Sequence, residues 1–187
     1  MHNTHRIHII GGAGSGKTTL AQRLGEWLDA PYYDLDEIGY EGGFAAKRPL
    51  ELRLADIQSI IAQPAWITEG GFIWWVDNLL RAADTIVWLD LPWRIRRWRI
   101  ITRHIKADLA HNNRHPGYRN LYNFYMRSRN YHRSKMLLTL DPDEGLANDS
   151  SNRITVAHKL APYEDKVVQC CSPADVEKFV AMLSIVQ

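Results

Sequence analysis

The stretch Gly11-Gly12-Ala13-Gly14-Ser15-Gly16-Lys17-Thr18 decides the fold of this 187-residue chain. It fits the pattern G-x-x-x-x-G-K-[ST], follows a β-branched run at residues 6–10 and precedes apolar residues at helical spacing over residues 16–28. In this strand–loop–helix context the pattern predicts a loop whose backbone N–H groups surround phosphate oxygens at a helix N-terminus. Lys17 would contact the β- and γ-phosphates, and the Thr18 hydroxyl would bind Mg²⁺.

Short apolar runs alternate with helical patterns along the rest of the chain. A parallel sheet with helices on both faces has this alternation, and right-handed crossovers favour one doubly wound sheet of five strands. We expect a three-layer α/β fold, with residues 1–187 in a single domain. The predicted strands cover residues 6–10, 31–35, 65–68, 84–90 and 166–170. The predicted helices cover residues 16–28, 49–63, 74–83, 93–105, 120–138 and 174–185.

Polar residues follow two of these strands at the edge of the sheet where ligands bind in such folds. Asp34 and Asp36 are two residues apart and can face the phosphate site together. One would hold Mg²⁺ through water and the other would accept the proton of an attacking hydroxyl, with a helix cap or turn as the alternative. Glu69 can orient water bound to Mg²⁺, and Gly70 and Gly71 let a substrate approach the backbone. A tight turn is the alternative for this second group.

Two other stretches have more than one interpretation. Asp90 closes an apolar run, which is typical of a Walker B strand, but the following Leu91-Pro92 favours a helix-capping role just as well. Residues 141–165 are rich in Asp, Asn, Ser and Pro, and this composition predicts a loop or insertion. Within it, residues 153–157 form a short β-branched run that predicts a strand.

Charge is divided unevenly along the chain. Residues 94–135 contain ten Arg and two Lys against one acid, Asp108, which is a net charge of +11. The rest of the chain holds 11 basic and 20 acidic residues, a net charge of −9. A block this one-sided repels itself unless an anion joins it. Polyphosphate, nucleic acid and an acidic face of the same protein are the three candidates.

The arginines of this segment also have helical order. Arg96, Arg99 and Arg103 are three and four residues apart, so they share one face of a helix. Arg127 belongs to a second basic helix, which follows the Pro116-Gly117 loop. Two basic helices on either side of a loop predict a lid that brings arginines over bound phosphates and excludes water.

Composition excludes several classes of protein. Hydrophobic residues make up 45% and charged residues 24%, values that argue against disorder, collagen-like repeats and coiled coil. Cys170 and Cys171 are adjacent and cannot form a disulfide framework, which predicts a reducing, cytoplasmic environment. No apolar run approaches the roughly 18 residues of a membrane span, so we expect no membrane partner. Neither the histidines nor the cysteines have metal-ligand spacing, so we expect no structural metal.

Several motifs occur in an order that can be compared with known families. They are Gly-Gly-Ala-Gly-Ser-Gly-Lys-Thr-Thr (11–19), Tyr-Asp-Leu-Asp (33–36), Trp-Ile-Thr-Glu-Gly-Gly-Phe (66–72), Ala-Asp-Thr-Ile-Val-Trp-Leu-Asp-Leu-Pro (83–92), the Arg99/Arg103 pair, and Cys-Ser-Pro-Ala-Asp-Val-Glu-Lys-Phe (171–179). In this order they resemble the small P-loop kinases of the adenylate kinase and shikimate kinase type. The chain resembles most closely the adenylate-kinase-like proteins called DNA topology modulation proteins.

The resemblance implies a strand order of 2-3-1-4-5 and an ATP site bordered by the loop after the last strand. It implies a substrate-side region at residues 37–64 and a lid at residues 104–119. It also implies that Asp34 lies near Mg²⁺, that Asp36 handles the acceptor, and that Arg99 lies near the adenine and phosphates. The substrate-side region departs from the family because its basic residues do not form a set for a nucleotide monophosphate. They are Lys47, Arg48 and Arg53.

We therefore expect an ATP- and Mg²⁺-dependent kinase that transfers the γ-phosphate to a small-molecule or nucleotide acceptor. The alternative is a nucleotide-dependent regulator that binds nucleic acid through residues 94–135. The predicted catalytic residues are Lys17, Asp36, Arg99 and Arg103. The predicted ATP-binding residues are Gly11, Gly12, Ala13, Gly14, Ser15, Gly16, Lys17, Thr18, Thr19 and Arg99. The predicted Mg²⁺ ligands are Thr18 and Asp34, and the predicted acceptor-binding residues are Asp36, Glu69, Gly70, Gly71 and Arg127.

Overall fold

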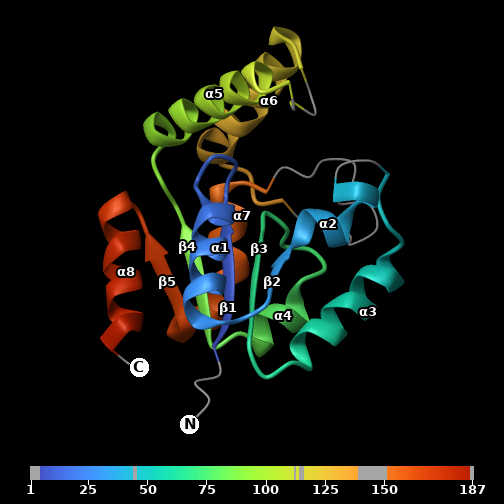
Figure 1. Cartoon of the computed structure of the whole chain (residues 1–187), viewed down its shortest axis with the longest axis vertical. Coiled ribbons are helices and arrows are strands. Elements are labelled where there is room, and N and C mark those ends of the chain that lie inside the picture. Colours follow the sequence, from blue (N-terminus) through green and yellow to red (C-terminus); the bar gives the residue numbers. More distant parts are fainter. Residues whose placement is uncertain (1–4, 44–45, 112, 114–115, 139–150, 186–187) are drawn as a thin grey trace.

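A five-stranded sheet lies at the centre of the molecule (Figure 1). The structure is a computed structural model, and it describes residues 5–43, 46–111, 113, 116–138 and 151–185. All strand pairs are parallel and their order is β2-β3-β1-β4-β5, which confirms the expected order and the three-layer α/β fold. The strands are β1 (Arg6–Gly11), β2 (Tyr32–Asp34), β3 (Trp66–Gly70), β4 (Thr85–Leu89) and β5 (Val167–Cys170).

Helices cover both faces of the sheet and the end at which its strands terminate. Helices α1 and α8 lie on one face, α3, α4 and α7 lie on the other, and α5 and α6 lie beyond the carboxyl ends of the strands (Figure 1). The α-helices are α1 (Lys17–Leu28), α2 (Leu35–Gly39), α3 (Leu50–Ile61), α4 (Asp77–Ala82), α5 (Trp93–Leu109), α6 (Tyr118–Arg133), α7 (Arg153–Leu160) and α8 (Pro173–Ile185). Two 3₁₀ helices, η1 (Glu41–Gly43) and η2 (Ala161–Lys166), complete the described elements.

The central strand β1 is buried on both sides, as expected for a parallel sheet. Its side chains alternate between the two faces, so Ile7 and Ile9 pack against α1 and α8 while Ile10 packs against α3 and α4. Buried residues of α1 lie at Leu20 and Leu24, one turn apart, which is the helical spacing seen in the sequence. Because β1 is fixed from both sides, the loop that follows it has a fixed starting point.

The loop between β1 and α1 needs glycine at two positions. Gly14 has φ +75° and Gly16 has φ +98°, a region of backbone conformation that side chains with a Cβ rarely adopt. Helix α1 begins at Lys17 and has no acidic residue in its first turn. No acidic residue of the helix itself therefore neutralises the positive end of its dipole, which suits an anion site.

The structure corrects the strand predicted at residues 153–157, which are helical and belong to α7. The Asn152 side chain accepts a hydrogen bond of 2.9 Å from the Thr155 backbone N–H and so caps the helix. Val156 and Leu160, four residues apart, are buried against the main core. A short β-branched run has the same apolar pattern in either state, and the cap with this burial selects the helix. Residues 139–150 of the predicted insertion lie outside the described residues.

The two regions named from the resemblance can be placed on these elements. Residues 37–64 contain the end of α2, η1 and α3, apart from positions 44 and 45. Residues 104–119 contain the end of α5, the connection and the start of α6, apart from positions 112, 114 and 115. The substrate-side and lid roles of these regions stay predictions. Across the described part of the chain, none of the helices has both the length and the apolar character for a membrane crossing.

Candidate functional site

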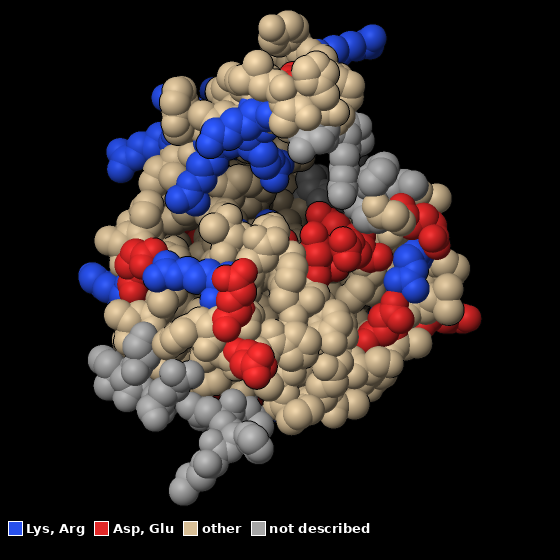
Figure 2. Space-filling model, viewed as in Figure 1, with Lys and Arg blue, Asp and Glu red and all other residues tan. Residues whose placement is uncertain are grey.

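A cavity of about 1210 Å³ opens at the carboxyl edge of the sheet, between the loop after β1, helix α2 and the α5–α6 pair. Figure 2 shows this hollow with Lys and Arg on its α5–α6 side and Asp and Glu on its α2 side. Its lining contains most of the residues that the sequence singled out. These are Gly11, Gly12, Ala13, Gly14, Gly16, Lys17, Thr18, Thr19, Asp34, Asp36, Glu69, Gly71, Arg99, Arg103 and Arg127.

Lys17 and Thr18 meet Glu69 at the floor of the cavity. The Thr18 hydroxyl donates a hydrogen bond of 2.5 Å to Glu69 Oε1, and Lys17 Nζ lies 3.9 Å from Glu69 Oε2. Strand β3 pairs with β1 and places Glu69 beside Ile9, so the sheet itself brings this carboxylate next to the start of α1. A cation, a hydroxyl and a carboxylate therefore share one small volume at the helix N-terminus.

Glu69 is almost fully buried, with 3% of its surface exposed. Burial raises the pKa of Glu69 above its ordinary value, and the charges of Asp34 and Asp36 add to this effect. The Lys17 ammonium and the Thr18 hydrogen bond act in the opposite direction but do not offset it. The ionised carboxylate is thus under-compensated in the protein alone, and a divalent cation beside it would supply the missing charge.

Asp34 and Asp36 also line the cavity, and the pairing of β2 with β3 places Asp34 beside Glu69. Asp34 Oδ1 accepts a hydrogen bond of 2.8 Å from the Asp36 backbone N–H, so Asp34 is the N-cap of α2. The capping role that the sequence left open is therefore present. A carboxylate has further acceptor positions, so the cap leaves Asp34 able to bind an ion through its other oxygen.

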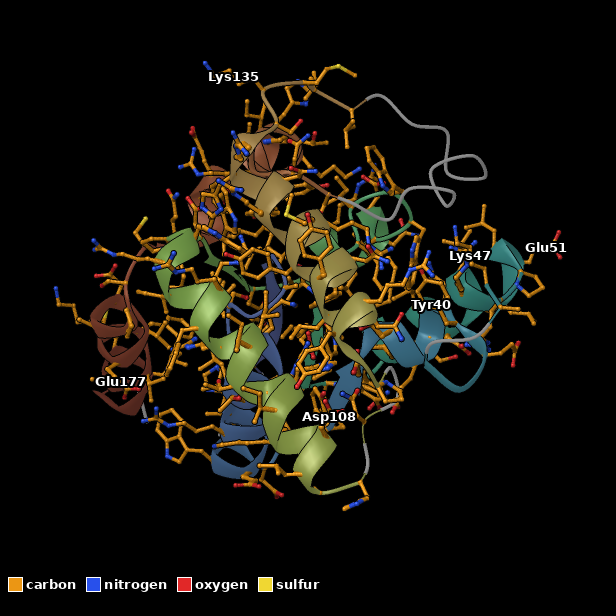
Figure 3. The ribbon with its side chains drawn as sticks, turned by 90° about the horizontal axis from the view of Figure 1, so that it is seen from above. Tyr40, Lys47, Glu51, Asp108, Lys135 and Glu177 are labelled. Carbon is orange, nitrogen blue, oxygen red and sulfur yellow. The ribbon has the colours of Figure 1, made fainter. Side chains whose placement is uncertain are left out.

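The basic wall of the cavity comes from α5 and α6. Arg99 Nη1 donates a hydrogen bond of 2.7 Å to the carbonyl oxygen of Ser15, and the Arg103 guanidinium lies 5.9 Å from the centre of the Phe124 ring. Arg127 enters the lining from α6. Seen from above, α5 and α6 lie side by side across the cavity, with Tyr40 and Lys47 beyond it (Figure 3). Long arginine side chains therefore lie over the loop, and the cavity beneath them has room for a polyanion.

Arg96 was grouped with Arg99 and Arg103 in the sequence, but its position is different because it is completely buried. Its Nε donates a hydrogen bond of 2.8 Å to the Ala13 carbonyl, and a Cβ at Gly12 would lie 2.4 Å from its Nη2. Gly12 therefore has to be glycine because Arg96 lies directly against the loop. Burial lowers the pKa of Arg96, and Tyr131 and Asp90 oppose that effect.

Two residues predicted for the site do not line the cavity. The Ser15 side chain is buried, and only its carbonyl contributes, as the acceptor for Arg99. Gly70 lies against α2, where an added Cβ would come within 2.8 Å of Leu35 Cβ, so its role is close packing. No described residue between 37 and 64 lines the cavity either. Arg48 is instead held within that region by Asp56, at 2.6 Å.

Asp90 is neither a Walker B residue at the cavity nor a helix cap, which corrects both interpretations of the sequence. It does not line the cavity, and α5 begins after Pro92 without a side-chain cap. Its Oδ2 accepts hydrogen bonds from Arg153 Nε at 2.7 Å and Gln169 Nε2 at 2.8 Å. Burial works against ionisation, but the nearby His132 ring and the hydrogen bonds from Arg153 and Gln169 outweigh it and lower the pKa of Asp90.

Sequence reasoning did not name several residues that line the cavity beside the predicted set. They are Thr102, Lys106, Ala107, Ala110, Phe124, Ser128, Tyr131 and Ser151. Those on α5 follow Arg99 and Arg103 at helical spacing, so the face defined by these arginines could have identified them. Those on α6 and Ser151 come together only through tertiary packing.

Three oxygen-bearing side chains at the cavity could hold a divalent cation. No group of three or more His, Cys, Asp or Glu side chains with the arrangement of a metal site occurs among the residues described. Mg²⁺ in phosphate-binding enzymes uses one or two carboxylates together with phosphate oxygens and water. The Thr18 hydroxyl, the under-compensated Glu69 carboxylate and Asp34 at the cavity floor fit that pattern.

Comparison with known proteins supports the fold. No protein-family model and no curated protein matches this chain. Shikimate kinase from Acinetobacter baumannii in complex with shikimate is 17% identical to this chain. The match covers 99% of this chain and 94% of the kinase, with a TM-score of 0.50. Shikimate kinase from Bacteroides thetaiotaomicron is 18% identical over 97% of each chain, with a TM-score of 0.47. An unliganded sugar kinase from Janibacter sp. HTCC2649 is 17% identical, covers 97% and 95%, and also has a TM-score of 0.47.

The match to the Acinetobacter baumannii enzyme extends over 99% of this chain, so it concerns the complete fold and not the loop alone. The narrower resemblance to DNA topology modulation proteins is not confirmed by these comparisons. At 17% identity the match to the first shikimate kinase shows a shared architecture and does not transfer a substrate. The chain has the fold of a P-loop kinase.

Proposed function

We propose that this chain is a phosphotransferase that uses ATP and Mg²⁺ to phosphorylate a small acceptor. The observation that carries the proposal is the cavity itself. A glycine-rich loop with Lys17 forms one wall, and three arginines of the α5–α6 pair form the facing wall. A polyphosphate fits between two such walls because each supplies positive charge to a different side of it.

In this proposal the backbone N–H groups from Gly12 to Thr19 bind the β- and γ-phosphates at the start of α1, and Lys17 bridges them. Arg99, Arg103 and Arg127 neutralise the charge that develops on the transferred phosphoryl group. Arg99 already bonds to the loop at Ser15, so little reorganisation is needed to reach a phosphate next to it. Together these groups supply positioning and charge, which account for most of the catalysis in phosphoryl transfer.

Mg²⁺, when bound, would neutralise phosphate charge and orient the terminal phosphate. Thr18 would be its direct protein ligand, and Glu69 and Asp34 would hold water in its shell. The existing Thr18–Glu69 hydrogen bond keeps both oxygens in place. The raised pKa of Glu69 supports the assignment, because a cation at this position removes the cost of burying its charge.

Asp36 is the residue that we assign to the acceptor. It lines the cavity, and its carboxylate can accept the proton of an attacking hydroxyl. Gly71 lies nearby with open space where a Cβ would be, since the nearest atom to an added Cβ is the Gly11 oxygen at 3.9 Å. An acceptor would enter between these two residues.

The first test of the function is binding of Mg²⁺–ATP by calorimetry to the wild type, Lys17→Ala and Lys178→Ala. Lys178 is an exposed lysine of α8 and serves as the matched control. We expect Lys17→Ala to lose at least tenfold in affinity, on the order of one charge-assisted contact with phosphate, and Lys178→Ala to bind normally. Absence of binding by folded wild-type protein would refute the proposal.

The second test is acceptor-stimulated release of ADP across a panel of small hydroxyl compounds and nucleotides. Asp36→Asn should retain ATP binding and lose turnover by about 10²-fold or more, because it removes a proton acceptor and not a phosphate contact. Tight ATP binding with no acceptor-stimulated turnover on any compound would identify a nucleotide-binding protein instead of a kinase.

A further inference from the structure

A chain of polar contacts runs from the phosphate loop to Asp90, which follows the carboxyl end of the neighbouring strand β4. It starts at Arg96, whose Nε bonds to the Ala13 carbonyl at 2.8 Å and whose Nη1 lies 3.0 Å from His132 Nδ1. Among the described residues no Asp or Glu forms a hydrogen bond with it, so a fully buried guanidinium is held by a loop carbonyl, a histidine ring and the Ser128 carbonyl at 3.4 Å. The Tyr131 ring, 4.6 Å away, covers its face.

The contact with Arg96 decides which ring nitrogen of His132 carries the proton. A guanidinium can only donate hydrogen bonds, so His132 Nδ1 must accept and must be unprotonated. The proton of the neutral ring is then on Nε2. This nitrogen lies 3.5 Å from Asp90 Oδ1.

Asp90 terminates the chain. Its Oδ2 is bonded to Arg153 and Gln169, while its Oδ1 is buried and has no hydrogen-bond partner. The Nε2–H of His132 points toward the one oxygen of this carboxylate that needs a donor. A neutral imidazole therefore lies between a buried cation and a buried anion. Its Nδ1 accepts from the Arg96 guanidinium, and its Nε2 faces the Asp90 carboxylate.

We propose that His132 is a positioning residue for the phosphate loop. In its neutral form it holds Arg96 against the Ala13 carbonyl, and protonation of its ring releases Arg96 and loosens the loop. The consequence for nucleotide affinity rests on the function proposed above, whereas the contact with the loop does not.

The charges around the ring explain why protonation would act in this direction. His132 faces Arg96 of α5, the Asp90 carboxylate after β4 with Arg153 of α7 bonded to it, and the ring of Tyr131, 5.1 Å away on its own helix. A proton on Nδ1 removes the acceptor for Arg96 Nη1 and puts two positive charges 3.0 Å apart. Asp90 faces Nε2, the ring nitrogen on the side away from Arg96, so it draws the protonated ring away from Arg96.

The test compares two substitutions that separate the ring's ability to accept a hydrogen bond from its ability to take up a proton. His132→Asn retains an oxygen that can accept from Arg96 and cannot titrate, whereas His132→Leu retains neither property. His104→Asn is the matched control, since His104 lies on α5 and pairs with Asp108 at 3.2 Å instead of with Arg96. Affinity for Mg²⁺–ATP is measured by calorimetry from pH 6 to pH 8.5. The ratio of variant to wild type at each pH cancels the ionisation of the nucleotide.

At pH 8 we expect His132→Leu to bind Mg²⁺–ATP about tenfold more weakly than the wild type, and His132→Asn to stay within about threefold. Toward pH 6 the wild type and His104→Asn should weaken relative to His132→Asn, which has no ring to protonate. Wild-type affinity in His132→Leu, or an unchanged pH dependence in His132→Asn, would overturn the proposal. If His132→Leu does not fold, the pH dependence of affinity in His132→Asn compared with the wild type still tests the proposal.

A second measurement needs no nucleotide. In nitrogen-labelled wild-type protein, NMR should find His132 with Nδ1 unprotonated at pH 8, and the amide signals of Ala13 and Gly14 should shift as this ring titrates. A proton on Nδ1, or amide signals of Ala13 and Gly14 that do not change during the titration, would overturn the proposal. If the wild type binds no ATP, the proposed function fails, and this measurement alone then decides the role of His132.

Discussion

His8 is a buried histidine in the central strand, on the side of the sheet that faces α3 and α4. Its Nδ1 forms a hydrogen bond of 2.9 Å with Thr68 Oγ1, and its Nε2 is buried without a hydrogen-bond partner. Burial first, and then the nearby charge of Lys17, lower the pKa of His8 to about 3. The folded protein therefore keeps His8 neutral under all ordinary conditions.

This burial predicts acid sensitivity that can be assigned to one residue. The unfolded chain takes up a proton at His8 below pH 6.5, while the folded protein does not until about pH 3, so acid favours unfolding across that interval. Between pH 6 and pH 4 the wild-type unfolding free energy should fall more steeply than that of His8→Asn, by up to about 1.4 kcal/mol per pH unit. Denaturant titration at each pH measures the difference. His158→Asn, at an exposed position of α7, should follow the wild type, and parallel curves for His8→Asn would contradict the assignment.

Glu69 leads to a prediction of opposite sign. Because burial raises its pKa, its contribution to stability is greatest in acid, where it is protonated, and is lost as the pH rises and the carboxylate ionises. Glu69→Gln should therefore melt at a higher temperature than the wild type at pH 8 without ligand, yet gain less from added Mg²⁺–ATP. Thermal unfolding with and without ligand measures both effects. Glu177→Gln, at an exposed position of α8, is the control, and a Glu69→Gln protein that gains as much as the wild type would exclude a role near Mg²⁺.

At the scale of elements, helix α5 divides its arginines between two tasks. Arg96, near its start, is buried against the phosphate loop, while Arg99 and Arg103 line the cavity one and two turns later. Arg97 is exposed and does not line it. The helix thus fixes the loop with one side chain and presents two others to the ligand.

We expect Arg99→Ala and Arg103→Ala each to lower kcat/KM by about 10²-fold, the usual loss when one group that stabilises transition-state charge is removed. Steady-state kinetics with the acceptor found in the screen measures this loss. Arg97→Ala on the same helix should leave kcat/KM unchanged. An equal loss in all three variants would show that the helix contributes through net charge and not through these two contacts.

At the scale of the whole molecule, the two charge blocks of the sequence meet across the cavity. Basic residues of the +11 segment, residues 94–135, line the cavity together with Asp34, Asp36 and Glu69. Figure 2 shows Lys and Arg on one side of the hollow and Asp and Glu on the other. An acidic face of the same protein therefore balances part of the basic segment. This arrangement leaves less unbalanced charge for nucleic acid than the sequence alone suggests.

We therefore expect double-stranded and single-stranded DNA and RNA to bind no more tightly than nonspecific affinity, with a Kd of about 10⁻⁴ to 10⁻⁶ M near physiological salt. Fluorescence anisotropy at 50 and 200 mM salt, with and without Mg²⁺–ATP, measures this affinity. Tighter binding that weakens steeply with salt and is displaced by ATP would instead favour the nucleic-acid-binding regulator.

Local patterns were sufficient for most of the framework. The glycine spacing and Lys17 define the loop between a strand and a helix, and the alternation of apolar runs predicts the parallel sheet that the structure contains. Both signals depend on neighbours within a few residues, so they can be read without knowing the fold. Helix α2 was missed because its five residues, beginning at Leu35, are too few to show a helical period.

The phosphate loop, the class of fold and the charged residues at the strand ends could all be predicted from the sequence. The packing of distant segments was needed to show that Asp90 faces His132 and Arg153 instead of the cavity, that residues 153–157 are helical, and that Arg96 lies under the loop. The two kinds of feature depend on interactions that act over different separations along the chain. Backbone geometry and side-chain spacing act between neighbours in the chain, whereas a buried polar group bonds to whichever donor or acceptor packing brings within reach, and here those partners lie 36 to 83 residues away.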